Sequence, residues 1–591
     1  MKKFILKTGL LLLVSFMFFS GCKKDKKETP TPTNPTTTSV TLTGNVIDVN
    51  NTPLSGVTVK VGTTTTTTNS DGSFYLSNVT VPISRFVVEF SSSGFFTLVR
   101  SAVPTPSEKY DLEVGLISET DVTYAGSTSF ASNTTGNLTM GNGCIIDFPA
   151  NAFITSTGSA FSGTVYVKAA YLDPTMNNYP MFVFGGDLYG KDSTGTEVMI
   201  NPYAGLNVII TDGANKLQLD TIHNVKADVQ FNIPNTLLTS APNTIELFDF
   251  DENAGMAYAN GTATKTGGKY MGQVQHFSFW NCAEFHPGKA LISGYVTDAS
   301  GSPIPGMPVR VGHTFAKTDI DGYYKKIVPT GVTITVGIFP SYLGSIITPQ
   351  IISPLTNGGS ATKVNFSIPG LKKVTGKIVN CAGNPVQAKV FLGWYSSIAY
   401  NNVHTSCFTK TDGTFTLFME NSISAAVIHV WGNGSDVANY IYPSTNPFDA
   451  GNIKICPPGP TTLVLNGGPF TTSTTFSSFD SKEGYKYIDT LGNAHTEIFV
   501  YGSDGMYNIS TNGFPTTVPT TYTIGTKSNG PTSMHFNTFG AIQASDSLQS
   551  GTIKITKVGA VDDLIEGNFS GTSYSGIAVS GVFSVPRHPD N

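Results

Sequence analysis

Short runs of alternating apolar and polar residues extend along almost the whole chain, and they predict β-strands. The segment GNVID, residues 44–48, alternates in this way, and VTVKV, residues 57–61, resumes the pattern after a turn sequence. Gly, Pro, Asn and Asp separate such runs, as is typical of chains built from short strands and tight turns. Patterns with the period of an amphipathic α-helix are almost absent, so the sequence predicts an all-β protein.

One stretch of this pattern occurs three times. TGNVIDVNNTPLSGVTVKVG begins at Thr43, and SGYVTDASGSPIPGMPVRVG begins at Ser293, with glycine, aspartate and proline at matching positions. A looser copy, VTGKIVNCAGNPVQAKVFLG, begins at Val374. An Asp-Gly pair follows each copy, and because glycine adopts positive φ readily, each pair predicts a hairpin turn before the next strand. These pairs are Asp71-Gly72, Asp321-Gly322 and Asp412-Gly413.

The repeated motif resembles the carboxypeptidase regulatory-like family. The resemblance implies a seven-stranded sandwich with transthyretin-like topology over residues 39–117, 288–369 and 370–458. In that family the sandwich is a non-catalytic module appended to metallocarboxypeptidases. The chain has no HxxE pair to bind the zinc of those enzymes, so the resemblance implies no peptidase activity.

Residues 118–287 differ from the repeats. FPANAF, residues 148–153, and HFSFWN, residues 276–281, resemble the extracellular β-sandwich of the astroprincin and cartilage intermediate layer protein families. The resemblance implies a role in adhesion or matrix, without catalysis. Residues 459–591 alternate through further strands and predict a C-terminal β-domain of unknown role.

The HFSFWN segment invites a functional interpretation of its polar positions. If it is a strand, Phe277 and Phe279 share one face and fill the core, while His276 and Trp280 lie on the opposite face. There they would cover a sheet edge or a neighbouring unit, or line a ligand site.

The first 21 residues have the features of a bacterial lipoprotein signal. Lysines precede an apolar run at residues 10–19, which is short for a membrane span, and Ser20-Gly21 precedes Cys22. This resembles a lipobox and implies that residues 1–21 are removed after Gly21 and that Cys22 is lipidated. An ordinary signal peptide followed by a chance cysteine is the alternative.

Residues 22–38 are rich in Lys, Thr and Pro and predict a flexible tether. The fold class is therefore all-β, with tandem β-sandwich modules on a lipidated flexible N-terminal tether. The Lys/Asp cluster directly after Cys22 resembles the surface-export signals of Bacteroidetes lipoproteins. It implies an outer-membrane lipoprotein that is anchored in lipid through Cys22 and exposed at the cell surface, with a periplasm-facing protein as the alternative.

Charge and cysteine content limit the chemistry. The net charge is -5 without a basic patch, which argues against binding of nucleic acid. The chain has 6 cysteines but no CxxC, so no metal or other cofactor is predicted. Since the ends of a sandwich often lie close together, we expect a disulfide between Cys381 and Cys456 and, as a weaker prediction, one between Cys144 and Cys282.

Aromatic residues beside Asn and Ser in the third repeat suggest contact with a glycan. Trp394 and Tyr395 are adjacent, so on a strand their side chains would point to opposite faces and one of them would lie outside the core. Trp431 precedes the segment GNGSD. Aromatic faces stack on sugar C–H groups, and amides bond sugar hydroxyls. Packing between modules is the alternative for all three residues.

No catalytic motif accompanies these features. HExxH, GxSxG, a P-loop and a dinucleotide-binding glycine pattern are absent from the sequence. We therefore expect a non-catalytic cell-envelope lipoprotein, a rod of β-sandwich modules for surface display, adhesion or structural interaction. The alternative is a glycan-binding outer-membrane lipoprotein that assists carbohydrate capture. The sequence leaves the partner, a glycan or a surface protein, and the oligomeric state open.

Overall fold

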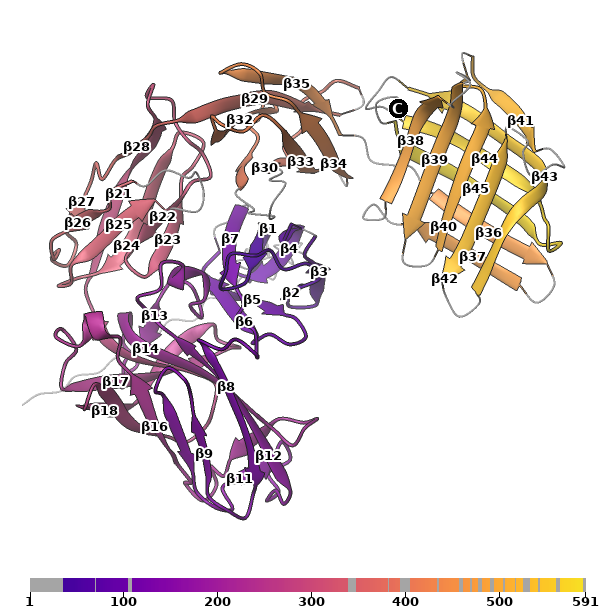
Figure 1. Cartoon of the computed structure of the whole chain (residues 1–591). Coiled ribbons are helices and arrows are strands. Elements are labelled where there is room, and N and C mark those ends of the chain that lie inside the picture. Colours follow the sequence, from indigo (N-terminus) through magenta and orange to yellow (C-terminus); the bar gives the residue numbers. More distant parts are fainter. Residues whose placement is uncertain are drawn as a thin grey trace, which may run out of the picture.

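The computed structural model confirms the all-β prediction (Figure 1). Strands dominate, and the helices of the described residues are two 3₁₀ turns, η1 (Tyr179–Met181) and η2 (Asn235–Leu237). Among these residues, no helix has the length and apolar character needed to cross a membrane. The structure describes residues 36–69, 71–104, 109–338, 347–380, 382–393, 404–432, 435–455, 461–467, 470–476, 481–488, 494–502, 505–515, 517–524, 532–539, 543–559 and 564–587.

The first repeat is a sandwich of two sheets. One sheet has the order β4-β1-β7 and the other β3-β2-β5-β6. Alternation produces the core: in β5 the side chains of Phe86, Val88 and Phe90 are buried, while the residues between them are partly exposed. The strands are β1 (Thr37–Ile47), β2 (Thr58–Val61), β3 (Thr64–Thr67), β4 (Ser73–Pro82), β5 (Phe86–Ser91), β6 (Leu98–Ala102) and β7 (Lys109–Gly115).

The second and third repeats reproduce this strand order. The second repeat has sheets β24-β21-β27, with β28 also on β21, and β23-β22-β25-β26, and the third has β32-β29-β35 and β31-β30-β33-β34. In the second repeat the strands are β21 (Lys289–Asp298), β22 (Pro308–Val311), β23 (Thr314–Lys317), β24 (Tyr323–Pro329), β25 (Ile334–Ile338), β26 (Gln350–Ile352), β27 (Ser360–Ala361) and β28 (Phe366–Ile368). In the third they are β29 (Leu371–Val379), β30 (Lys389–Gly393), β31 (His404–Phe408), β32 (Thr414–Glu420), β33 (Ala426–Gly432), β34 (Ser435–Ile441) and β35 (Phe448–Lys454).

The Asp-Gly pairs form turns with positive φ, but these turns are not hairpins. In the first repeat the turn leads from β3 to β4, which belong to different sheets. Gly72 has φ of 77°, and a Cβ there would lie 2.4 Å from the carbonyl oxygen of Val46. Glycine is therefore required both by conformation and by close approach to the first strand. A Cβ on Gly322 would approach the carbonyl oxygen of Val296 in the same way, and a Cβ on Gly413 would approach that of Ile378.

The unit at residues 118–287 is built around an 11-stranded sheet of order β8-β12-β14-β20-β17-β18-β19-β16-β10-β9, with β13 beside β14 and β18. Its two end strands, β8 and β9, contact each other, so the sheet curls around its own core. The strands are β8 (Ala125–Ala131), β9 (Gly136–Thr139), β10 (Ile145–Phe148), β11 (Phe153–Thr155), β12 (Thr164–Leu172), β13 (Tyr189–Lys191), β14 (Glu197–Thr211), β15 (Leu217–Leu219), β16 (Ala227–Asn232), β17 (Thr244–Asp251), β18 (Met256–Thr266), β19 (Lys269–Val274) and β20 (Phe279–His286).

The first five residues of β20 are buried on both faces, which corrects the prediction for Trp280. Phe279 belongs to the core shared with the first repeat, whereas Trp280 belongs to the core of residues 118–287. Trp280 is 1% exposed, and its Nε1 donates to the carbonyl oxygen of His276 at 3.1 Å. The prediction that Phe277 and Phe279 share one face is also wrong, because β20 begins at Phe279 and residues 276–278 precede it. Phe277 therefore lies in the same core as Trp280.

The C-terminal unit is a separate 10-stranded sheet that curls until β38 meets β45 through a bridge between Gly484 and Arg587. Its interior is apolar, with Ile498, Tyr507 and Phe569 in the core. The strands are β36 (Thr461–Gly467), β37 (Phe470–Phe476), β38 (Ser481–Ile488), β39 (Ala494–Gly502), β40 (Gly505–Asn512), β41 (Thr520–Ile524), β42 (Ser533–Phe539), β43 (Gln543–Val558), β44 (Leu564–Ser573) and β45 (Ala578–Pro586).

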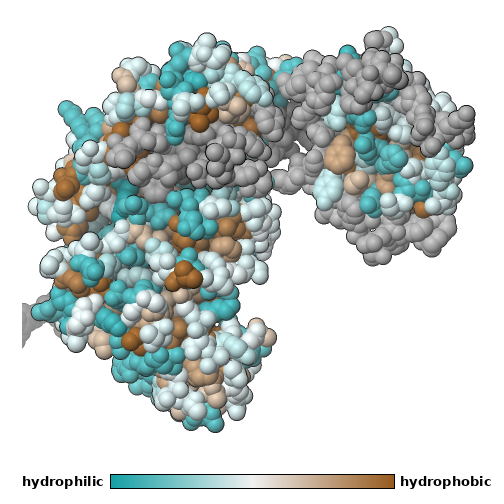
Figure 2. Space-filling view, in the orientation of Figure 1, coloured by the Kyte–Doolittle hydropathy of each residue, from teal (hydrophilic) through white to brown (hydrophobic). Residues whose placement is uncertain are grey.

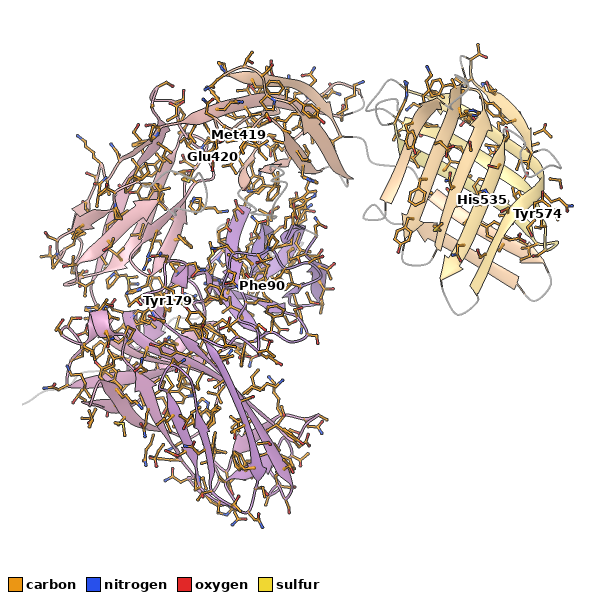
Figure 3. All side chains as sticks on the ribbon, in the orientation of Figure 1. Phe90, Tyr179, Met419, Glu420, His535 and Tyr574 are labelled. Carbon is orange, nitrogen blue, oxygen red and sulfur yellow. The ribbon has the colours of Figure 1, made fainter. Side chains whose placement is uncertain are left out.

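The first four units fold back on one another around the first repeat (Figure 1). One continuous core cluster includes Phe90 of the first repeat, Phe182 of residues 118–287 and Val309 of the second repeat. Figure 3 places Tyr179, which is fully buried, where these units meet. On the face seen in Figure 2, hydrophobic residues form small groups between hydrophilic ones. This arrangement differs from the predicted extended rod, because surfaces between modules are used for packing.

Candidate functional site

A buried ionic cluster joins three of the units. Asp111 on β7 of the first repeat accepts contacts from Lys317 on β23 of the second repeat at 2.9 Å and from Lys389 on β30 of the third repeat at 2.5 Å. Lys317 also meets Glu113 at 2.5 Å. The Lys389 side chain is 1% exposed, so its charge depends on these partners. We call Asp111, Glu113, Lys317 and Lys389 the ionic junction.

The ionic junction contains two acidic and two basic side chains, and their proximity shifts the pKa values of Asp111 and Lys317. Burial alone would raise the pKa of Asp111, but the ammonium groups of Lys317 and Lys389 outweigh it and hold that pKa well below its usual value. Burial would lower the pKa of Lys317, yet Asp111 and Glu113 raise it overall. Burial lowers the pKa of Lys389, and Asp111 opposes that shift, so the charge of Lys389 depends on the Asp111 carboxylate.

A buried arginine joins the first repeat to residues 118–287. The guanidinium of Arg100 on β6 donates to the carbonyl oxygen of Pro180 at 2.7 Å, to that of Glu113 at 3.0 Å and to that of Val183. Burial lowers the pKa of Arg100 to about 10, and Asp187 and Glu113 oppose the shift, so the group is charged at neutral pH. One side chain thus satisfies two carbonyl groups across the boundary, those of Pro180 and Val183, and one in its own unit.

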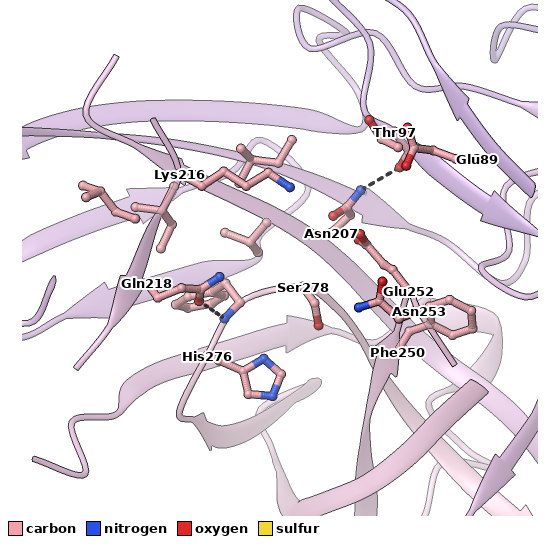
Figure 4. A pocket seen from close by; sticks show the side chains of 15 residues that line it. Glu89, Thr97, Asn207, Lys216, Gln218, Phe250, Glu252, Asn253, His276 and Ser278 are labelled. Carbon is pink, nitrogen blue, oxygen red and sulfur yellow. Dashed lines mark hydrogen bonds between the residues drawn. The ribbon is translucent and has the colours of Figure 1, made fainter. Parts of the chain in front are cut away.

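A polar groove of about 400 Å³ opens beside this boundary (Figure 4). It exists because β20 stops pairing with β14 at Asn207, whereas β12 continues along β14 to Thr211. Glu89 and Thr97 of the first repeat form one wall. The other lining residues come from 118–287: Asn207, Val208, Ile209, Ile210, Lys216, Leu217, Gln218, Phe250, Glu252, Asn253, His276, Phe277 and Ser278.

Several polar groups of the groove lack protein partners. The Ser278 hydroxyl is buried without a hydrogen bond, and Asn207, 7% exposed, makes one long bond from Nδ2 to the Thr97 carbonyl oxygen at 3.4 Å. Partial burial raises the pKa of Glu252; Lys216 opposes the shift, and Glu89 adds to it. The groove therefore combines unused donors and acceptors, which is the chemistry of a binding site.

His276 is the groove residue that sequence analysis singled out. Its Nε2 lies 3.3 Å from Asp249 Oδ2, and its ring centroid lies 5.1 Å from that of Trp280. These contacts fix the imidazole in the wall. The described residues contain no group of three or more His, Cys, Asp or Glu side chains able to hold a metal ion.

Most of the predicted site residues lie outside the described part of the chain: Gly21, Cys22, Cys381, Trp394, Tyr395 and Cys456. Trp431 is described, and its assignment as a glycan contact is wrong. It is 4% exposed, packs on Phe391 with ring centroids 4.4 Å apart, and lies 6.3 Å from the ring of Tyr75 in the first repeat. Trp431 thus takes the alternative role of packing between modules.

The predicted disulfide between Cys144 and Cys282 is also wrong, because both thiols are free and buried, as is that of Cys407. Burial raises the pKa of Cys144 and of Cys407 to about 12 and that of Cys282 well above its usual value.

Since the thiolate is the reactive form, we expect a thiol reagent to modify these three residues only after unfolding. Peptide mapping after labelling with and without denaturant measures this, and native labelling of any of the three would contradict it.

His313 gives the packing of the second repeat a pH dependence. Its ring lies 5.5 Å from that of Tyr179, and burial, with Arg310 adding to the effect, lowers its pKa to about 4. The folded pKa lies below the unfolded one, so this stability is complete above about pH 6.5 and is lost as pH falls toward 4.

We expect His313→Phe to remove this dependence, so that the parent loses about 3 kcal/mol more than the variant between pH 7 and 4. Thermal unfolding across that range measures the difference. His223→Gln is the matched control, because the His223 side chain is 76% exposed. Parallel curves for the parent and His313→Phe would show that His313 is not the group responsible.

Sequence analysis missed the residues that join the units. Asp111, Lys317 and Lys389 are single charges within alternating strands, and 278 positions separate Lys389 from Asp111. Such charges are usually solvated, and nothing local distinguishes them. The weak signal is that Asp111 and Glu113 project from the same face of one strand.

Comparisons with known proteins do not identify a family. No protein family model and no curated protein match the chain. Among solved structures, the Streptococcal ancillary pilin aligns with 37% of this chain and 95% of its own at 10% identity and a TM-score of 0.14. The Bacillus anthracis TIE protein aligns with 90% of this chain and 74% of its own, at 10% identity and a TM-score of 0.14. BcpA, the major pilin subunit of Bacillus cereus, aligns with 71% of this chain and 99% of its own, at 10% identity and a TM-score of 0.12. Scores this low carry no argument about function.

Proposed function

We propose that the protein is a non-catalytic cell-envelope lipoprotein, anchored through Cys22, whose β-sandwich modules form a structural body for surface display or adhesion. The observation that supports this is the ionic junction, in which Asp111 holds Lys317 and Lys389 from two other modules. Buried pairs of this kind fix one arrangement of modules. A fixed body between a tether and the C-terminal unit suits the holding of that unit away from a membrane.

Two measurements on intact cells test the proposal. Metabolic labelling with an alkyne fatty acid should label the full chain and fail to label Cys22→Ala. Protease treatment of the same cells should release peptides from residues 459–591 while a periplasmic control protein stays intact. If the parent takes up no label, the lipoprotein assignment fails. If the peptides appear only after the outer membrane is opened, surface display fails and a periplasmic scaffold replaces it.

Carbohydrate capture is the second candidate, and the polar groove supports it. Trp431 is excluded as a contact, and the groove between the first repeat and residues 118–287 offers amide, hydroxyl and carboxylate groups instead. Glycan binding by the purified full chain tests this candidate separately from its location in the cell.

A further inference from the structure

We infer that the groove between β5, β14 and residues 276–278 is a binding site for a short neutral oligosaccharide. This inference rests on the second candidate function and assigns it a place that the sequence did not indicate. The groove, at about 400 Å³, lies within the range of protein pockets for small ligands. It can hold about two or three sugar rings.

The mixture of groups in the groove favours a polyhydroxylated ligand. Glu89 and Glu252 offer carboxylate acceptors, Lys216 offers an ammonium donor, and Asn207 and Asn253 offer both functions of an amide. Sugar hydroxyls both donate and accept, so one ring can satisfy neighbouring groups of opposite kinds. A strongly charged ligand fits less well, because the two carboxylates and the ammonium lie within one small volume.

Asn207 is the buried polar side chain of the wall that has hydrogen-bonding capacity to spare. It is 7% exposed and uses one amide hydrogen in a bond of 3.4 Å to the Thr97 carbonyl oxygen. The rest of its amide can meet a ligand hydroxyl or a bridging water, whereas Ser278 Oγ is enclosed by protein atoms and is not a contact for the ligand. Figure 4 shows Asn207 of residues 118–287 beside Thr97 of the first repeat.

The walls are held before any ligand binds. The backbone amide of Val208 donates a hydrogen bond to the carbonyl oxygen of Ser278 at 3.3 Å, and the backbone amide of Phe277 donates one to Gln218 Oε1 at 3.4 Å. Across the boundary, Arg85 pairs with Asp187 at 2.8 Å and fixes the first repeat against residues 118–287. A site held in this way loses little entropy on binding.

The test uses the purified full chain in detergent and an array of neutral di- to tetrasaccharides, followed by calorimetry with the best binder. Asn207→Ala should weaken binding about threefold to tenfold, and Glu252→Ala about tenfold. Since the Asn207 side chain makes a long bond of 3.4 Å, its removal should change the unfolding temperature little. Ser127→Ala, an exposed serine of β8 in the same unit, is the control and should bind like the parent.

Each other outcome overturns the inference. If no saccharide binds, the groove has no such ligand. If a saccharide binds equally well to Asn207→Ala and Glu252→Ala, it occupies another place. If a roughly tenfold increase in salt concentration greatly weakens binding, the ligand is recognised through charge and the neutral class is wrong. None of these results depends on lipidation or surface display, which the cell experiments measure independently.

Discussion

Replacing Asp111 with alanine should loosen the third repeat from the first, while the second repeat keeps the apolar core that it shares with the first. The substitution leaves the Lys389 ammonium, 1% exposed, without its carboxylate and leaves Lys317 with Glu113 alone. Breaking a buried pair by removing one partner costs about 3–5 kcal/mol, because the remaining charge is neither paired nor hydrated. The modules themselves keep their cores, so the loss falls on the contacts between them.

Small-angle scattering and limited proteolysis measure this loosening. Asp111→Ala should increase the radius of gyration and speed cleavage between modules, while the β-sheet signal in circular dichroism stays the same. Glu197→Ala is the matched control, because its pair with Lys289 also links two units but is exposed, with side chains 49% and 39% accessible. Exposed pairs contribute about 1 kcal/mol or less, so the control should stay closed. An Asp111→Ala protein as compact as the control would contradict the role of the ionic junction.

The same cluster predicts resistance to moderate acid. Because the pKa of Asp111 in the fold lies well below its unfolded value of about 4, its stabilising effect is fully present above that pH. It disappears only as pH falls through the lowered folded value. If the parent opens between pH 5 and 4, we expect His313 to be responsible, and His313→Phe should then stay closed in scattering over that range.

The sequence predicted structure well where residues that are neighbours in the chain determine it. Alternation identified the all-β fold, and glycine with positive φ explains the turn at Gly72. The prediction of a hairpin at the same turn is wrong, because the two adjoining strands belong to different sheets. A turn sequence specifies the local backbone path, whereas the pairing of the next strand depends on distant residues.

Contacts between modules explain the failures at the candidate site. Trp431 follows the expected strand pattern, but its outer face packs against Phe391 and Tyr75 rather than solvent. Trp280 differs, because the core of its own unit covers it. An aromatic residue on the outer face of a strand is equally suited to a ligand and to a neighbouring domain, and composition does not distinguish them. The polar groove was not predicted because its walls come from two units.

Arg100→Ala should loosen the first repeat from residues 118–287, with a loss of about 3–5 kcal/mol. Three carbonyl groups, those of Glu113, Pro180 and Val183, lose a charged donor at once, and each buried unsatisfied group costs about 1–3 kcal/mol before water enters. Arg100→Lys should recover only part of this, because an ammonium lacks the planar fork that reaches several acceptors.

A second variant reaches the same contact from the opposite side. Gly186 has φ of 81°, and a Cβ there would lie 2.8 Å from Nη1 of Arg100, so Gly186→Ala should displace the guanidinium while leaving its charge in place. Both variants should lower the thermal transition of these units and expose their boundary to protease. Lys168→Ala, which breaks a pair with Glu119 whose side chains are 44% and 22% exposed, is the control and should cost about 1 kcal/mol or less. If Arg100→Ala resembled that control, the boundary would depend on its apolar contacts alone, and the arginine would serve only to occupy space among the carbonyl groups.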